Sequence, residues 1–270
     1  MNSTIFTIRA DKPHSVSLLL DSCNLVSAIG SATTVMLKPN LVEALQPPIT
    51  TPVELVSEVV LYLRRIRPEL EIIIAEGSGA TEYETWHPFD LLGYSKMAEA
   101  FDVRLIDLNV EPQRKLKNEA CRQWPIMYLP EVLFDVFLIS IPVLKAHSLA
   151  GVTLTMKNMM GAAPPEHFQQ GGHWKKAAFH ENVQEAVFDL NRYRTPDFTI
   201  LDASIGMQQA HLWGPTCNPP HNLLAASQDP VAIDAYGAKL LKRDWRQIGH
   251  IAMANRVLGN ADSYQVKKVT

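Results

Sequence analysis

Polar side chains that can bind anions or move protons come directly after several short apolar runs in this sequence. They are Lys38 and Asn40 after residues 34–37, Glu76, Gly77, Ser78 and Gly79 after residues 71–75, Lys145 and His147 after residues 134–141, Asp202 after residues 198–201, and residues 227–229 after residues 223–226. If these runs form parallel strands, their carboxyl ends meet at one edge of a sheet, where open α/β sheets bind ligands. We therefore expect one small-molecule site at that edge.

Lys145 and His147 could carry out proton transfer because both emerge from an otherwise apolar run. Histidine titrates near neutral pH, and burial can lower the pKa of a lysine toward neutrality. His180 precedes a helical pattern that begins near residue 183, where the positive end of the helix dipole favours a neutral imidazole. Lys145, His147 and His180 are therefore the candidate general acids and bases. A structural histidine with satisfied hydrogen bonds is the alternative for His147.

The earlier polar clusters favour the binding of a carboxylate or a phosphate. Lys38 would hold the anion and Asn40 would orient it. In the turn at 76–79 glycine allows close approach of the main chain, so the backbone N–H groups of this turn could face the anion. The alternatives are a surface lysine beside a turn asparagine and a simple glycine turn that leaves a strand.

Three further residues complete the candidate binding site. Lys157 and Asn158 would stabilise negative charge that develops on the substrate. Asp202 could bind a substrate hydroxyl or orient a histidine. For Lys157 and Asn158 the alternative is a solvated helix end that closes at Gly161.

A metal site is a second way to use the histidines, because His167, His173 and His180 lie close together in the sequence. His147, His173 and His180 are the candidate ligands. No HExxH or HxH spacing places two of them on one face, and no carboxylate accompanies them at ligand spacing. A metal-dependent enzyme therefore stays an alternative.

The elements that must position these residues alternate between strand and helix patterns. Residues 52–67 show apolar side chains at 3.6-residue spacing, with Thr51 as the expected N-cap. Strands that are apolar on both faces and alternate with helices predict a doubly wound, mostly parallel sheet with helices on both faces. We expect a single α/β domain over 1–270, with a loop-rich flap segment inserted at about 146–180. Residues 206–221 show no pattern that predicts a role.

Composition excludes several other classes of protein. The net charge of −3 offers no field for nucleic acid. Cys23, Cys121 and Cys217 form neither an iron–sulfur nor a zinc motif, and there is no nucleotide-binding fingerprint, so the sequence leaves the identity of any cofactor open. No apolar run approaches the ~20 residues that span a bilayer. We expect a cytoplasmic protein that contacts neither nucleic acid nor membrane.

The order and spacing of these motifs resemble the domain-of-unknown-function 362 family over roughly residues 38–241. The motifs that carry the resemblance are Lys38-Pro39-Asn40, Glu76-Gly77-Ser78-Gly79, Pro142 to His147, Gly151 to Gly161 and Asp229-Pro230 to Asp234. The resemblance implies an α/β domain with a shared site and does not imply a reaction. Many relatives carry ferredoxin-like cysteine motifs, which this chain lacks.

The leading hypothesis is an enzyme that performs acid–base chemistry on a small anionic substrate, a carboxylate or a phosphate. The resemblance adds the alternative of a non-catalytic binding or redox-accessory protein that acts with an iron–sulfur partner. Assembly into a homo-oligomer is compatible with either hypothesis.

Overall fold

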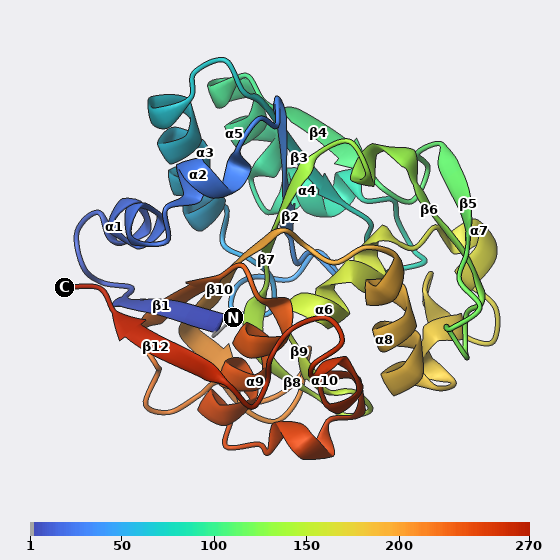
Figure 1. Ribbon diagram of the computed structural model, residues 1–270. Helices are drawn as coiled ribbons and strands as arrows, with labels where there is room; N and C mark the ends of the chain where they lie inside the picture. The colour runs from blue at the N-terminus through green and yellow to red at the C-terminus, as the bar shows by residue number, and fades with distance from the viewer. Residues whose placement is uncertain (1–2) are drawn as a thin grey trace.

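A large sheet runs through the middle of the molecule in the computed structural model, which describes residues 3–270 (Figure 1). Its strands are β1 (Ser3–Arg9), β2 (Thr34–Pro39), β3 (Glu71–Glu76), β4 (Arg104–Asp107), β7 (Phe137–Ile141), β8 (Val143–His147), β9 (Gly151–Thr153), β10 (Phe198–Met207), β11 (Leu223–Ser227) and β12 (Tyr264–Lys268). The main order is β12-β1-β11-β10-β7-β2-β3-β4, and β8 joins β10 and β9 beside this path. A separate hairpin pairs β5 (Gln113–Lys117) with β6 (Ile126–Pro130).

The sheet is mostly parallel, as the alternation of patterns predicts. Strands β4, β3, β2, β7 and β10 are parallel neighbours, and β8 is parallel to β10. Strand β11 runs antiparallel to both β10 and β1. Residues 227–229 therefore leave the sheet at the edge opposite the other clusters, and Asp229 caps α9 by accepting hydrogen bonds from Val231 N and Ala232 N.

Helices cover both faces of the sheet (Figure 1). They are α1 (Ser15–Ser22), α2 (Leu25–Ile29), α3 (Val53–Ile66), α4 (Trp86–Leu91), α5 (Tyr94–Phe101), α6 (Thr155–Asn158), α7 (Pro165–Phe168), α8 (Val183–Tyr193), α9 (Pro230–Leu240) and α10 (Gly249–Ala254), with short 3-10 turns at 131–133, 159–162, 177–180 and 245–247. A hydrophobic core lies on each face of the sheet. Successive side chains of one strand point to opposite faces, so they pack in different cores. Val35 and Leu37 pack with α1 to α5, whereas Met36 packs with α6, α8, α9 and α10.

The start of α3 differs from the expected capping arrangement. Pro52, and not Thr51, occupies the N-cap position. The Thr51 hydroxyl donates to Ile141 O at 2.6 Å and accepts from Asn40 N at 2.9 Å. Thr51 therefore joins the end of β2 to the end of β7 and is not available to cap the helix.

The segment at 146–180 is packed more tightly than an inserted flap would be. Residues 151–153 form β9 and pair with β8, and the side chains of Phe168 and Phe179 are buried in one core. Residues 148–149 and the stretch 169–174 are exposed throughout. The apolar residues between the glycines and prolines explain this difference, because they bury against α8 and the sheet. No helix within residues 3–270 combines the length and apolar character needed to cross a bilayer.

Candidate functional site

A cavity of about 500 Å³ opens at the carboxyl ends of β2, β3 and β8. Its wall is formed by Asn40 and Val42 after β2, Glu76, Gly77 and Gly79 at the end of β3, Lys145 and His147 on β8, Thr153 on β9, Lys157 and Asn158 on α6, and residues from 171–180 and 211–213. The predicted edge of the sheet therefore carries a cavity large enough for a small organic molecule.

Lys145 and His147 face this cavity together because they are two residues apart on one strand, and such residues share a face. Lys145 Nζ donates to the backbone oxygen of Ile49 at 2.6 Å. Burial, with a smaller contribution from the charge of Lys157, lowers the pKa of Lys145 to about 7. Lys145 can therefore exist in either protonation state near neutral pH.

His147 is held as a neutral hydrogen-bond donor. Its Nδ1 accepts hydrogen bonds from Leu149 N and Ala150 N, each at 3.1 Å, so the ring hydrogen belongs on Nε2. Burial and then the charge of Lys157 lower the pKa of His147 far below its ordinary value. His147 was expected to act as a general acid or base. Because its Nδ1 already accepts two hydrogen bonds and its Nε2 carries the ring hydrogen, it can donate a hydrogen bond to a ligand but cannot accept one.

His180 and His211 lie against the same ring. The ring centroid of His147 is 4.0 Å from that of His211 and 6.2 Å from that of His180. Burial and the charge of Lys157 lower the pKa of His211 to about 4 and also lower the pKa of His180. The Nδ1 atoms of both rings have no hydrogen-bond partner within residues 3–270. Both rings are therefore neutral at pH 7 and can accept a proton.

Lys157 is the cation common to these groups. Its charge contributes to the lowered pKa of His147, His180, His211 and Lys145 alike. Burial lowers its own pKa to about 8. Among the described residues the side chain of Lys157 forms no ion pair or hydrogen bond, which leaves its amino group free to contact a ligand.

Lys38 does not reach the cavity, which corrects its expected role in holding an anion. Lys38 Nζ lies 2.7 Å from Glu76 Oε1, and both side chains are buried. Glu76 also accepts hydrogen bonds from Leu41 N at 3.1 Å and Gly77 N at 2.9 Å. Glu76 lines the cavity, but its charge is balanced by Lys38.

The turn at 76–79 is not an anion-binding loop, because its N–H groups already have protein acceptors. Gly77 N donates to Glu76, Ser78 N to the Thr85 hydroxyl, and Gly79 N to Val42 O. Ser78 lies outside the cavity wall, and its hydroxyl donates to Val42 O. The turn therefore shapes the wall and offers no free donors.

Glycine is required at 77 and 161 by close packing. A Cβ at Gly161 would lie 1.9 Å from Glu76 Oε1 and 2.7 Å from Lys38 Nζ. A Cβ at Gly77 would lie 2.3 Å from Gly161 O and 2.5 Å from Asn109 Oδ1. The sequence suggested that Gly161 ends a helix. In the structure it instead covers the ion pair of Lys38 and Glu76.

Asn158 connects strands and is not free to bind a substrate. Its Nδ2 lies 3.2 Å from Lys38 O, 3.3 Å from Pro39 O and 3.0 Å from Ser140 Oγ, and its Oδ1 accepts from Asn40 Nδ2 at 3.0 Å. Asn40 Oδ1 has no hydrogen-bond partner in the described part of the chain. Asn40 is thus fixed by Asn158 and keeps one free acceptor in the wall.

Two expected site residues lie elsewhere. Asp202 is outside the cavity wall because β10 does not end at Leu201 but continues to Met207, and its carboxylate accepts from Ser204 N at 2.8 Å. His173 is exposed and also outside the wall. No group of three His, Cys, Asp or Glu side chains in residues 3–270 is arranged to hold a metal ion. Of the three candidate metal ligands, His147 and His180 share the cavity wall and His173 lies outside it.

Among the wall residues that were not predicted from the sequence are His211, Lys176, Trp174 and Trp213. Lys176 is buried and donates to Asn109 Oδ1 and Ala163 O, and burial lowers its pKa to about 7. These residues lie in loops without strand or helix periodicity. A pair of lysines after Gly-Gly-His-Trp at 171–174 was the only local signal.

Comparison with known proteins adds a family and a fold. The sequence model of a family described as "Domain of unknown function (DUF362)" matches residues 35–239. No curated protein matches the chain. The fold is similar to the lactate racemase apoprotein from Thermoanaerobacterium thermosaccharolyticum, with a TM-score of 0.50 and 11% identity over 92% of this chain and 58% of that one. This chain therefore spans little more than half of that protein's length, and the likeness shows a shared fold.

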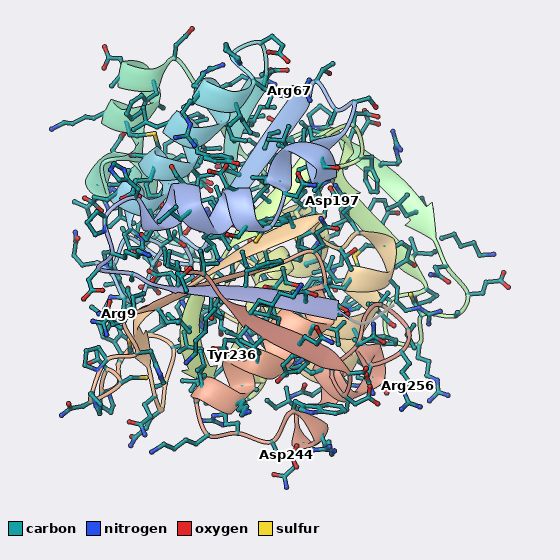
Figure 2. All side chains as sticks on the ribbon, turned by 60° about the vertical axis from the view of Figure 1, so that its left-hand side comes forward. Arg9, Arg67, Asp197, Tyr236, Asp244 and Arg256 are labelled. Atoms are coloured by element: carbon teal, nitrogen blue, oxygen red, sulfur yellow. The ribbon has the colours of Figure 1, made fainter. Side chains whose placement is uncertain are left out.

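Removing the charge of Glu76 should destabilise the protein strongly, because Lys38 would be left buried without a partner. We expect Glu76→Gln to lower the free energy of unfolding by about 3–5 kcal/mol, as measured by urea denaturation. Arg9, which Figure 2 labels, forms an exposed ion pair with Asp11. Arg9→Met should therefore lower the free energy of unfolding far less than Glu76→Gln does. Equal costs for the two variants would contradict the structural role of the buried pair.

The two glycines of the 76–79 turn should respond differently to alanine. Gly77→Ala places a Cβ against Gly161 O and should lower the free energy of unfolding by about 1–3 kcal/mol. A Cβ at Gly79 meets its neighbours at 3.5 Å or more, so Gly79→Ala should change stability by less than about 0.5 kcal/mol. Thermal melts of both variants test this, and a costly Gly79→Ala with a neutral Gly77→Ala would refute the packing argument.

Proposed function

This chain belongs to the DUF362 family, and from the geometry of its own cavity we propose that it is an enzyme that performs acid–base chemistry on a small anionic molecule. One observation carries the proposal. Two lysines with lowered pKa values, Lys145 and Lys157, and three histidines with lowered pKa values share one cavity wall. Perturbed titratable groups that cluster in one cavity are typical of catalytic sites.

The charges of the wall favour an anionic substrate. Glu76 is the acidic residue of the wall, and its charge is balanced by Lys38. Lys145 and Lys157 have no carboxylate partner within residues 3–270. A carboxylate or phosphate at this position would stabilise their charged forms through charge-assisted hydrogen bonds, each worth roughly 1.5–3 kcal/mol.

The hydrogen-bond arrangement suggests a division of roles. His180 and His211 are neutral and can act as bases, whereas Lys157 can donate a proton as an ammonium group. His147 Nε2–H can polarise a substrate oxygen without titrating, because its Nδ1 is occupied by two backbone donors. Lys145, held by Ile49 O, would position the anion.

The structural neighbour is a racemase of lactate, which is itself a small carboxylate. The likeness supports only a shared fold, so the substrate class proposed here rests on the lysines and histidines of this chain. Isomerisation, elimination and hydrolysis all remain compatible with the proposed roles.

Proton exchange provides a direct test of acid–base catalysis. We expect the protein to catalyse deuterium incorporation in D₂O at the carbon beside the carboxylate of lactate or of phosphoglycolate, as followed by ¹H NMR. His180→Asn or Lys157→Met should slow this exchange by about 10²-fold or more. Lys239→Met, an exposed substitution on α9, is the matched control. Anion binding without exchange on either compound would overturn catalysis by proton removal beside the carboxylate.

Anion affinity should fall as the pH rises. In the free protein the pKa values of Lys145 and Lys157 are about 7 and about 8, so both lose protons between pH 6 and 9. Acetate stays ionised over this range and prefers the ammonium forms. Its affinity should therefore be highest at pH 6 and lower by roughly tenfold at pH 9, with proton uptake visible in calorimetric titrations.

The lysine variants provide the control for this pH dependence. Lys145→Met should weaken acetate binding at pH 6 and flatten the pH profile. It should also reduce the rise in stability of the free protein between pH 7 and 10, because the unfolded chain holds more protons on lysine in that window than the folded one. A pH-independent affinity in the unaltered protein would refute the assignment of these lysines to anion binding.

A further inference from the structure

The cavity changes character from its inner end to its mouth. At the inner end Lys145 is 0% exposed and His147 is 3% exposed. At the mouth Trp174 is 38% exposed, Leu149 59% and Trp213 74%, and all three line the same cavity. A molecule that fills the cavity therefore contacts charged groups at one end and apolar groups at the other.

The apolar rim, defined as Leu149, Trp174 and Trp213, is assembled from three separate segments. Leu149 lies between β8 and β9, Trp174 lies in the exposed stretch 169–174, and Trp213 lies in the loop after β10. Large exposed apolar side chains that converge on one mouth indicate a binding surface. Indole rings present flat faces on which another ring can stack.

The position of Trp174 is fixed by a contact of its own ring and by hydrogen bonds of the next residue. Its ring lies over Gly79, where an added Cβ would be 3.7 Å from Trp174 Cε3. The next residue, Lys175, donates from its backbone N to Gly79 O at 2.9 Å and from Nζ to Glu84 at 2.7 Å. Trp174 is therefore positioned before any ligand arrives.

The volume of the cavity exceeds what a small acid requires. About 500 Å³ lies within the range of sites that hold drug-sized ligands. The carboxylate of such a ligand would occupy only the inner end beside Lys145 and Lys157. The rest of the cavity wall includes the apolar side chains of Met160 and Leu212 and those of the apolar rim.

We propose that the ligand of this cavity is an amphipathic anion, with its carboxylate or phosphate group at Lys145 and Lys157 and an aromatic ring against Trp174 and Trp213. The charged end of this assignment rests on the proposed function, whereas the aromatic end rests on the apolar rim alone. Because the rim and the lysines line one continuous cavity, a single small molecule can contact both.

Matched pairs of anions test the proposal, with acetate against phenylacetate and inorganic phosphate against phenyl phosphate as the probes. Calorimetry or ligand-observed NMR at pH 6 should show phenylacetate binding at least tenfold tighter than acetate. Phenyl phosphate should likewise bind more tightly than inorganic phosphate. Trp213→Ser should remove most of the gain for the phenyl compounds. Trp86→Ser, which changes a tryptophan 49% exposed on α4 and outside the cavity, should leave the gain intact.

The outcomes separate this inference from the proposed function. Equal affinity for acetate and phenylacetate, unchanged by Trp213→Ser, would overturn the aromatic assignment and leave anion binding standing. Failure of all four anions to bind would overturn both. If Trp213→Ser instead alters the oligomeric state in size-exclusion chromatography without changing phenylacetate affinity, the rim is a protein interface and the inference is wrong.

Discussion

The buried ion pair of Lys38 and Glu76 is the interaction on which the rest of the site depends. It joins the ends of β2 and β3 at 2.7 Å, and Gly161 covers it so closely that no side chain fits there. Removing either charge would leave the other buried without a partner, which is strongly unfavourable. Because Glu76 is balanced by this pair, the lysines at the cavity wall have no internal carboxylate to neutralise them.

The motifs that carry the family resemblance therefore divide into two physical roles. Lys38, Gly77, Asn158 and Gly161 hold the strand ends and α6 together through buried contacts. Lys145, on β8, faces the cavity that these residues shape. A motif residue close in sequence to the cavity therefore need not contact a ligand. Its hydrogen-bond and ion-pair partners in the folded protein show whether it supports the cavity or lines it.

The lysines and histidines of the cavity wall have lowered pKa values because they are buried without a carboxylate partner among residues 3–270. Desolvation is the first cause of every lowered pKa at the inner wall of the cavity, and the charge of Lys157 adds to it for the neighbouring groups. An anion would reverse both effects, so binding and protonation are coupled. Contacts with the apolar rim do not depend on the protonation of the lysines. The two ends of the cavity can therefore be tested separately.

The pattern of apolar residues in the sequence was enough to predict the central, mostly parallel sheet and the edge that carries the cavity, because apolar periodicity is local and the carboxyl ends of parallel strands meet. It also singled out Lys145, His147, His180 and Lys157, which line the cavity. Three-dimensional contacts were needed to show that Lys38 is paired, that Asp202 lies within a longer strand, and that His211 and two tryptophans line the cavity. These depend on contacts between residues far apart in the chain, such as Lys38 with Glu76, and on loops that have no periodicity for a sequence pattern to reveal.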